Sequence, residues 1–390
     1  MANAYPYLLL LVAFGFLAVA NQYFAGASIA GAKGKRSATC IVALLLFVFF
    51  FGFRGFVAYD WTAYTETFAN LPDLPSFFHA DNSRFKTEPG FLLLVATCKT
   101  LVPNYLFFQM VCTLINTTLL TLFIRRYTQN LPAVLVLYIT MSGLDFSIDL
   151  MRNSLSIFIF LNAIPLIEKR RLVPYLLVCL LAATFHTSAL AYLPMYFVLG
   201  RRWNKKLMAV VLLAVNIVCV FRLPIVKTLA TMAAGLLSPT AAQYIDTYIS
   251  YQAQGSSIGI GYAEKLFTGV MLLCYIDKLR ALRGTNVLVN SLFLYLAVNL
   301  SLSEFRTISV RCSNLFVFAY WIVWLDLAKC LYYKSNKILY VVFISLYCLL
   351  KTYSGCSGSM SQYYNVLLEN SDGGHNARFI YFRQHQNDKN

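Results

Sequence analysis

Ionisable residues are scarce in this chain. Asp and Glu together number 16 and His 4 among 390 residues, and charged residues make up only 12% of the sequence. Hydrophobic residues supply 59%, and apolar runs of membrane-spanning length occur from one end of the chain to the other. Because about 20 apolar residues cross a bilayer as a helix, this composition excludes an ordinary soluble domain. The sequence predicts an all-α polytopic integral membrane protein.

Other features that the sequence lacks exclude further classes of protein and kinds of site. The ten cysteines show no CxxC or other metal-binding spacing and lie mostly in apolar segments, which excludes a disulfide framework or a zinc site. We expect no metal and no cofactor. The first apolar run lacks a preceding basic segment, which favours a retained helix over a cleaved signal peptide. The chain has no internal repeat, which disfavours a transporter built from inverted halves.

Basic residues indicate topology. The formal net charge is +16, but in a membrane protein Lys and Arg mark cytoplasmic loops before they suggest a nucleic-acid partner, and we expect no nucleic acid. Basic clusters alternate with the apolar runs, and placing the clusters inside puts both termini outside. The prediction is about twelve transmembrane helices, near residues 4–24, 39–55, 105–124, 131–148, 153–167, 172–185, 187–199, 207–221, 263–276, 286–302, 312–328 and 338–350.

We expect one transmembrane domain over residues 1–355, with long outer loops at 55–90 and 222–262, and a polar, partly flexible outer tail at 356–390. The segment from Phe91 to Asn104 is too short for an easy crossing and is closed by Pro103. We interpret it as a re-entrant or interfacial helix. Such a segment is tolerated at membrane depth only inside protein or beside a wet cavity, so it hints at a cavity.

The stretch SGLDFSIDLMRNSLSIF places three charges in apolar surroundings at the expected outer face. If the stretch is helical, Asp145, Asp149 and Arg152 are spaced four and three residues apart and share one face. They would form either a local ion-pair cluster or part of a site. An arginine that departs from the positive-inside trend more often lines a site or pairs within the bundle.

Further outward polar residues also lie in apolar surroundings. Taken singly, each has a structural alternative: His186 could be a satisfied boundary histidine, and Arg54 could extend to lipid headgroups. Arg306 and Arg311 are about 140° apart on a helical wheel, so they converge only if the helix breaks between them. Together the set suits an amphipathic anionic ligand such as a lipid diphosphate. Its members are Arg54, Asp60, Tyr64, Glu88, His186, Arg222, Glu304, Arg306 and Arg311.

The order of these motifs resembles the EpsG family of Wzy-type polysaccharide polymerases. The resemblance lies in the arginine after the second helix, YDWTAY with Asp60 and Tyr64, EPGF from Glu88, Arg152 opening a helix, the cytoplasmic EKRR, and ATFHTSAL around His186. It covers residues 40 to 200 and extends more loosely to the arginines 306 and 311 and to YYN at 363–365. The chain has Arg152-Asn153 where family members often have Arg-Gln, and Ala58-Tyr59 where they have a Gly near the Asp.

The resemblance implies a GT-C-like glycosyltransferase with its active site facing the periplasm or cell exterior of the bacterial inner membrane. Such an enzyme transfers a growing glycan from undecaprenyl diphosphate to a sugar hydroxyl of a new lipid-linked repeat unit. The implied partners are this lipid-linked oligosaccharide, as donor and acceptor, membrane lipid and a chain-length regulator protein.

Chemistry then suggests roles for the residues. We expect Arg152, Arg306 and Arg311 to hold the diphosphate, with Arg54 as a weaker fourth and Arg222 and Tyr64 as further substrate contacts. The candidate bases are Asp60, Glu88, Asp149 and His186, and the sequence does not choose between His186 and Glu88. Outer-loop aromatics would offer faces for sugar rings or form an interfacial belt. They are Tyr59, Trp61, Tyr64, Tyr244, Tyr248 and Tyr251.

Three other activities remain open at this point. An O-antigen-type ligase has nearly the same sequence chemistry, but it makes no ladder of products. A lipid-linked oligosaccharide flippase would need its arginines in a central cavity. A membrane-bound O-acyltransferase would need a deep histidine paired with an upstream Asn or His, and only His79, His186, His375 and His385 exist.

Overall fold

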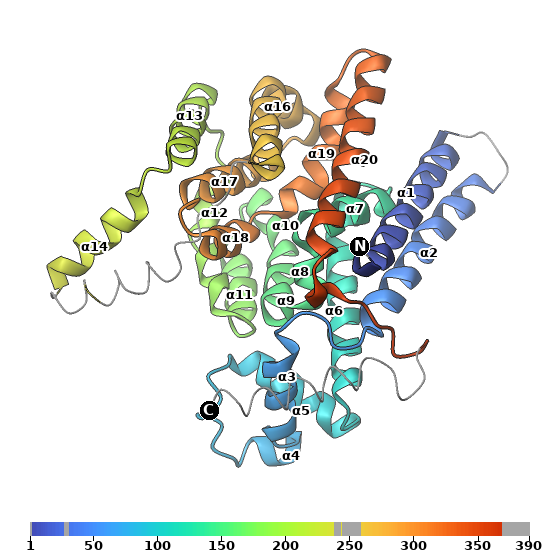
Figure 1. Cartoon of the computed structure of the whole chain (residues 1–390), viewed down its shortest axis with the longest axis vertical. Helices are drawn as coiled ribbons and strands as arrows, with labels where there is room; N and C mark the ends of the chain where they lie inside the picture. The colour runs from blue at the N-terminus through green and yellow to red at the C-terminus, as the bar shows by residue number, and fades with distance from the viewer. Residues whose placement is uncertain (1, 27–30, 238–242, 244–258, 369–390) are drawn as a thin grey trace. The chain divides into compact units, whose positions relative to one another are not determined.

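The regular secondary structure of the described residues is helical. The computed structural model describes residues 2–26, 31–237, 243 and 259–368 (Figure 1). Within this part of the chain the strand-like pairing is an isolated bridge between Arg54 and Asn365. The expected all-α class is therefore confirmed.

The chain forms two compact units, each described by itself. Unit 1 comprises Met1–Tyr196 and Leu339–Asn390, and unit 2 comprises Phe197–Ile338. A single transmembrane domain over residues 1–355 stays a prediction. Unit 1 contains α1 Tyr5–Gly26, α2 Ala32–Gly52, α3 Trp61–Asn70, α4 Leu74–Phe77, α5 Pro89–Leu101, α6 Tyr105–Tyr127, α7 Leu131–Tyr138, α8 Leu144–Ile148, α9 Met151–Leu161, α10 Ile164–Glu168, α11 Leu172–Ala183, the 3-10 helix η3 Thr187–Tyr192 and most of α20 Lys334–Cys356. Unit 2 contains α13 Lys205–Phe221, α14 Ile225–Leu237, α16 Ile260–Arg283, α17 Val287–Ser301, α18 Arg306–Asn314 and α19 Phe318–Cys330, and α12 Met195–Leu199 spans the boundary.

Several helices have the length and composition to cross a membrane. Five qualify singly: Tyr5–Gly26, Ala32–Gly52, Tyr105–Tyr127, Leu131–Ile148 and Lys334–Cys356. Two bent pairs, α13 with α14 at 92° and α18 with α19 at 70°, raise the number to 7. The protein is thus of the multi-pass membrane class, while twelve crossings stay a prediction. Short helices at expected crossings, such as α11 with 12 residues and α17 with 15 residues, contribute to the difference.

Helix ends differ from the expected boundaries where basic residues continue a helix. The second helix begins at Ala32 and not near residue 39, so Lys33, Lys35 and Arg36 lie in its first turns and not in a loop. Likewise α16 runs to Arg283 and includes Lys278 and Arg280. Lys and Arg have high helix propensity, so a charge cluster does not by itself end a helix.

The chain between α7 and α9 is broken. Met141 has non-helical φ and ψ, Ser142 has a φ of 62°, and α8 ends at Ile148 before Leu150 caps α9. Gly143 is required there, because a Cβ atom would collide with the carbonyl of Tyr138. The expectation that Asp145, Asp149 and Arg152 share one helical face is therefore wrong. The two breaks give these side chains separate neighbours.

A hydrophobic cluster lies beneath the YDWTAY and EPGF motifs. It joins Tyr64 and Phe68 of α3 with Phe91 of α5, Phe108 of α6 and Met151 of α9, and Phe185 packs against it. The aromatic rings interlock, since Phe91 lies 5.6 Å from Tyr64 and 5.7 Å from Phe108 between ring centroids. This cluster fixes α3, α5 and α9 relative to one another and so positions the polar residues above it.

The segment after α20 closes unit 1. Tyr363 stacks on Phe50 at the end of α2 with ring centroids 4.0 Å apart, and Asn365 donates to the Phe49 carbonyl at 3.2 Å. The backbone N–H of Gly55 donates to the Tyr364 carbonyl at 2.8 Å. The YYN motif therefore supports the chain on both sides of Arg54.

Candidate functional site

The EPGF turn, residues 88–91, docks on the end of α11. Glu88 caps α5 and Pro89 occupies its first turn, where a missing N–H costs nothing. The N–H groups of Gly90 and Phe91 both donate to the Thr184 carbonyl, at 2.8 and 3.3 Å. Gly90 lacks the Cβ atom that would collide with Thr184, and the Phe91 side chain is fully buried below. Backbone contacts thus bring EPGF and ATFHTSAL together.

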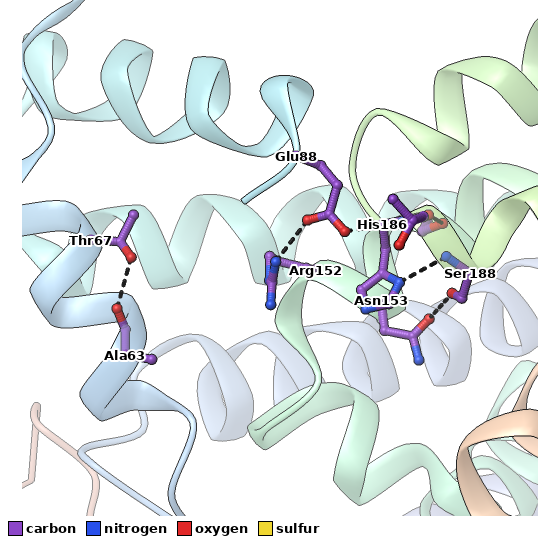
Figure 2. A network of polar contacts seen from close by, with 9 residues as sticks. Ala63, Thr67, Glu88, Arg152, Asn153, His186 and Ser188 are labelled. Atoms are coloured by element: carbon purple, nitrogen blue, oxygen red, sulfur yellow. Dashed lines mark hydrogen bonds and ion pairs between the residues drawn. The ribbon is translucent and has the colours of Figure 1, made fainter. Parts of the chain in front are cut away.

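Glu88 and Arg152 form the central ion pair of this site. Glu88 Oε2 accepts from Arg152 Nη1 at 2.7 Å (Figure 2). The other oxygen, Oε1, accepts from the Thr187 N–H at 3.1 Å. The Glu88 side chain is 12% exposed and that of Arg152 is 28% exposed. The carboxylate is therefore enclosed, while the guanidinium keeps an open side that can meet a ligand.

The environment of Glu88 favours its charged form. Burial raises the pKa of a carboxyl group, but the Thr187 N–H bond and the Arg152 charge outweigh this and hold the pKa of Glu88 below its ordinary 4.5. Glu88 is thus a carboxylate at neutral pH and a weak proton acceptor. It is better suited to fixing Arg152 than to acting as the base.

This lowered pKa predicts acid sensitivity. Because the folded-state pKa of Glu88 lies below the unfolded value, Glu88 stabilises the fold above pH 4.5, and the contribution is lost as pH falls through the lowered pKa. The thermal unfolding temperature of the detergent-solubilised protein should fall on acidification. In Glu88→Gln the unfolding temperature should depend less on pH. Glu66→Gln, at an exposed position in α3, should keep the wild-type dependence. Equal slopes for Glu88→Gln and wild type would contradict the assignment.

Tyr64 feels the charges of both Arg152 and Asp60. Its side chain is buried, with the residue 7% exposed. Burial, with Asp60 acting in the same direction, raises the pKa of Tyr64 to about 12, so its hydroxyl stays protonated. Asp60 begins α3 one turn before Tyr64, as the motif predicts. The three side chains therefore form one polar group beside the ion pair.

His186 occupies the start of η3. Its Nδ1 accepts from the Ser188 N–H at 3.1 Å, and Ser188 Oγ donates to Asn153 Oδ1 at 3.2 Å (Figure 2). An Nδ1 that accepts a hydrogen bond carries no proton, so the neutral ring carries its proton on Nε2. Neither nitrogen then offers a lone pair to a substrate hydroxyl. His186 organises the loop that supplies Thr187 to Glu88.

Asp149 orders the start of α3. Its Oδ1 accepts from the backbone N–H groups of Tyr59 and Asp60, at 3.1 and 3.0 Å. The contact joins residues about ninety positions apart and holds Asp60 at the edge of the site. The local ion-pair interpretation of the opening stretch is wrong, because Arg152 pairs with Glu88 while Asp149 binds backbone amides.

Arg54 is enclosed. It is 4% exposed and donates to the carbonyls of Phe51 and Ile148, so the alternative that it extends to lipid headgroups is wrong. Its own carbonyl accepts from Gln109 Nε2 at 2.8 Å. These bonds tie the end of α2 to α6 and to the end of α8, and we leave Arg54 out of the proposed ligand set.

Replacing Arg54 should unfold this junction. Arg54→Met retains apolar bulk but leaves the carbonyls of Phe51 and Ile148 without this donor. We expect a loss of about 2–5 kcal/mol of stability, measured as a lower temperature of thermal unfolding in detergent. Arg126→Met, at an exposed position at the end of α6, is the matched control and should unfold like wild type. An unchanged midpoint for Arg54→Met would contradict the structural role.

The other predicted ligands belong to unit 2 and are described apart from this site. Arg306 and Arg311 are both exposed on the unbroken helix α18, so the break needed for their convergence is absent within it. Arg222 is an exposed left-handed cap after α13. Glu304 accepts from the first N–H groups of α14, at 2.9 and 3.2 Å. A role of these arginines in diphosphate binding stays a prediction.

The outer-loop aromatics fall into two groups. Tyr59 is 57% exposed, whereas Trp61 is 5% exposed and stacked on Phe56 at 4.2 Å. Tyr59 can therefore offer a ring face and Trp61 cannot. The other expected ring platforms, Tyr244, Tyr248 and Tyr251, lie outside the described residues.

Sequence reasoning missed the backbone and amide members of the site. Thr184 and Thr187 act through main-chain groups, and Asn153 acts through an amide. A signal existed for Asn153, which directly follows Arg152, and for Ser188 two residues after His186. Among the described residues there is no group of three or more His, Cys, Asp or Glu side chains that could hold a metal ion.

Comparison with known proteins agrees with the motif order. A sequence profile described as the EpsG family matches residues 37–366, which is most of the chain and includes every member of the site. Searches of curated proteins and of solved structures found no match. The profile reaches from α2 to the YYN segment, whereas the motif resemblance was firm only to residue 200. The chain belongs to the EpsG family, a family of Wzy-like polysaccharide polymerase-type proteins.

Proposed function

We propose that this protein is a glycosyltransferase that polymerises lipid-linked glycan repeat units. It transfers the growing chain from undecaprenyl diphosphate to a sugar hydroxyl of a new lipid-linked repeat unit. The reaction takes place at the outer face of the bacterial inner membrane, on a GT-C-like scaffold of about twelve crossings. Family membership supports the polymerase class, and the Glu88–Arg152 pair is the observation that supports the chemistry.

Arg152 is the proposed diphosphate ligand. Departure of undecaprenyl diphosphate leaves negative charge on phosphate oxygens, and a pre-oriented guanidinium stabilises that charge without rearranging. Glu88 supplies the orientation, since its oxygens are held by Arg152 and the Thr187 N–H. Tyr64, whose hydroxyl interacts electrostatically with Arg152, keeps its proton and can donate to the same phosphate.

Asp60 is the proposed base. Asp60 is half-buried at the start of α3, where Asp149 accepts its backbone N–H, and its charge acts on the Tyr64 hydroxyl, as the charge of Arg152 does. Glu88 is paired with Arg152, which it orients. A carboxylate here can accept the proton of the attacking sugar hydroxyl while the diphosphate lies against Arg152.

The experiment is a reconstituted polymerisation. Purified protein in liposomes receives only its cognate undecaprenyl-diphosphate repeat unit, with chelator and without nucleotide sugar, and the products are separated on a gel. We expect a ladder of increasing chain length. Intact protein that yields no ladder from confirmed cognate substrate would overturn the proposal in favour of a ligase or a flippase.

Asp60→Asn tests the assigned base in the same assay. The amide cannot accept the hydroxyl proton, so we expect the initial rate of ladder formation to fall about 10²–10⁴-fold. Binding of the lipid-linked substrate should remain, because Glu88 and Arg152 are unchanged. Glu66→Gln, on the same helix and exposed, should leave the rate unchanged. A wild-type rate for Asp60→Asn would assign the base elsewhere.

A further inference from the structure

Unit 2 contains a basic pocket formed by none of the residues assigned to the proposed chemistry. It has a volume of about 620 Å³ and lies between the end of α16, the end of α19 and the start of α20. Three exposed lysines, Lys278, Lys329 and Lys337, line it together with Leu282 and Tyr332. No acidic side chain lines this pocket. The concave surface therefore gathers positive charge from three separate segments.

A buried carboxylate, that of Asp326, holds one of the three lysines in place. Asp326 in α19 is 1% exposed, and its oxygens accept from Arg283 at 2.6 and 2.7 Å and from Lys329 at 2.9 Å. One buried carboxylate thus binds two cations, and one of them is the pocket residue Lys329. Lys278 Nζ lies 3.4 Å from the Cys330 carbonyl and 5.6 Å from the Tyr275 ring centroid. The nearby Asp277 pairs with Arg202 at 3.5 Å. Positive charge remains in excess at the opening.

The surroundings of the pocket are apolar and aromatic. Tyr332 is 83% exposed, the next residue, Tyr333, is 63% exposed, and Leu282 is 47% exposed. Tyrosines collect at the level of lipid headgroups, and lysines extend there from apolar surroundings. A ligand that satisfies both features carries phosphate on one part and hydrocarbon on another. Basic pockets between membrane helices bind anionic lipid headgroups on this principle.

We infer that the basic pocket, formed by Lys278, Lys329, Lys337, Tyr332 and Leu282, binds the headgroup of an anionic phospholipid. The lysines contact the phosphate, and Tyr332 and Leu282 lie against the glycerol and the upper acyl chain. This inference does not depend on the proposed polymerase activity. The site belongs to unit 2, whereas the Glu88–Arg152 pair belongs to unit 1.

The test measures lipid binding by native mass spectrometry of the full-length protein in detergent. Phosphatidylglycerol and cardiolipin are compared with zwitterionic phosphatidylethanolamine. The variant Lys278→Gln, Lys329→Gln, Lys337→Gln should bind the anionic lipids about 100-fold more weakly, since each basic residue near a membrane surface contributes about a factor of five. Arg283 still binds Asp326 in this variant, so the buried carboxylate keeps a partner.

A matched variant controls for net charge. Lys33→Gln, Lys35→Gln, Lys206→Gln removes the same charge from exposed positions outside the pocket and should bind anionic lipid like wild type. Equal lipid affinity for both triple variants would overturn the inference. Glycerol phosphate, titrated in a separate arm, should compete only weakly. Full displacement of lipid by glycerol phosphate at equal concentration would overturn the lipid assignment in favour of a free phosphate compound.

Discussion

Arg152→Gln should reduce the initial rate of polymer formation about 100- to 1000-fold, the range expected for loss of one oriented donor to developing charge. The substitution removes the guanidinium that faces the ligand and leaves Glu88, 12% exposed, without its cation. Arg152→Lys should also lose activity, though less, because an ammonium group cannot contact Glu88, Tyr64 and a phosphate through one planar fork. The measurement is the rate of ladder formation in liposomes.

Two variants make this result specific. Arg126→Gln removes an exposed arginine at the end of α6 and should polymerise normally. The double variant Glu88→Gln, Arg152→Gln removes both charges. It should regain the folding yield that Arg152→Gln loses through its unpaired Glu88, but it should not regain activity. A normal ladder from Arg152→Gln would remove Arg152 from the site, and recovery of activity in the double variant would mean that the pair is structural.

Gly90→Ala should be nearly as damaging through geometry alone. The new Cβ atom would lie 2.8 Å from the Thr184 carbonyl oxygen and closer still to the Thr184 side chain, so the EPGF turn cannot stay on the end of α11. We expect about 1–3 kcal/mol of lost stability, as for other overpacked positions, and loss of the ladder because Glu88 moves with the turn. Thermal unfolding and ladder formation measure the two effects.

Gly34→Ala is the matched glycine control. It lies in α2 with open space around its Cα, so the added methyl group should leave stability and activity unchanged or slightly raise stability. Thr184→Ala in the Gly90→Ala background should restore little, since the carbonyl oxygen of residue 184 remains in contact. Wild-type stability and activity for Gly90→Ala would show that the turn is not docked as described.

The helices were largely predictable, because apolar runs of sufficient length have few alternatives in this composition. Each expected crossing coincides with a helix or with consecutive short helices. The boundary between the crossings 131–148 and 153–167 was expected, but the break inside the first of them was not. Residues 131–148 read as one continuous apolar helix, and the left-handed Ser142 and the close approach of Gly143 to Tyr138 arise from packing that the local pattern does not contain.

The site was predictable in its members more than in its contacts. The motifs grouped Asp60, Tyr64, Glu88, Arg152 and His186 as site candidates, and all five lie in unit 1, where Glu88 pairs with Arg152. The carboxylate that pairs with Arg152 is Glu88, which is 64 residues away in the sequence. Asp149 is only three residues away, but it accepts from the backbone N–H groups at the start of α3. Helical spacing favoured the wrong partner because it assumed a continuous helix.

The hydrogen bonds made by residues 358–366 have a consequence for biosynthesis. This segment accepts from Asn3 and Tyr7 near the first helix and from the N–H groups of Gly55 and Ala58, and the Val366 N–H donates to Phe53. Unit 1 therefore contains residues from both ends of the chain, and in the sequence the 142 residues of unit 2 come between its two parts. A ribosome delivers those ends far apart in time. The amides beside Arg54 gain these partners only after translation has passed residue 364, so assembly of unit 1 follows synthesis of nearly the whole chain.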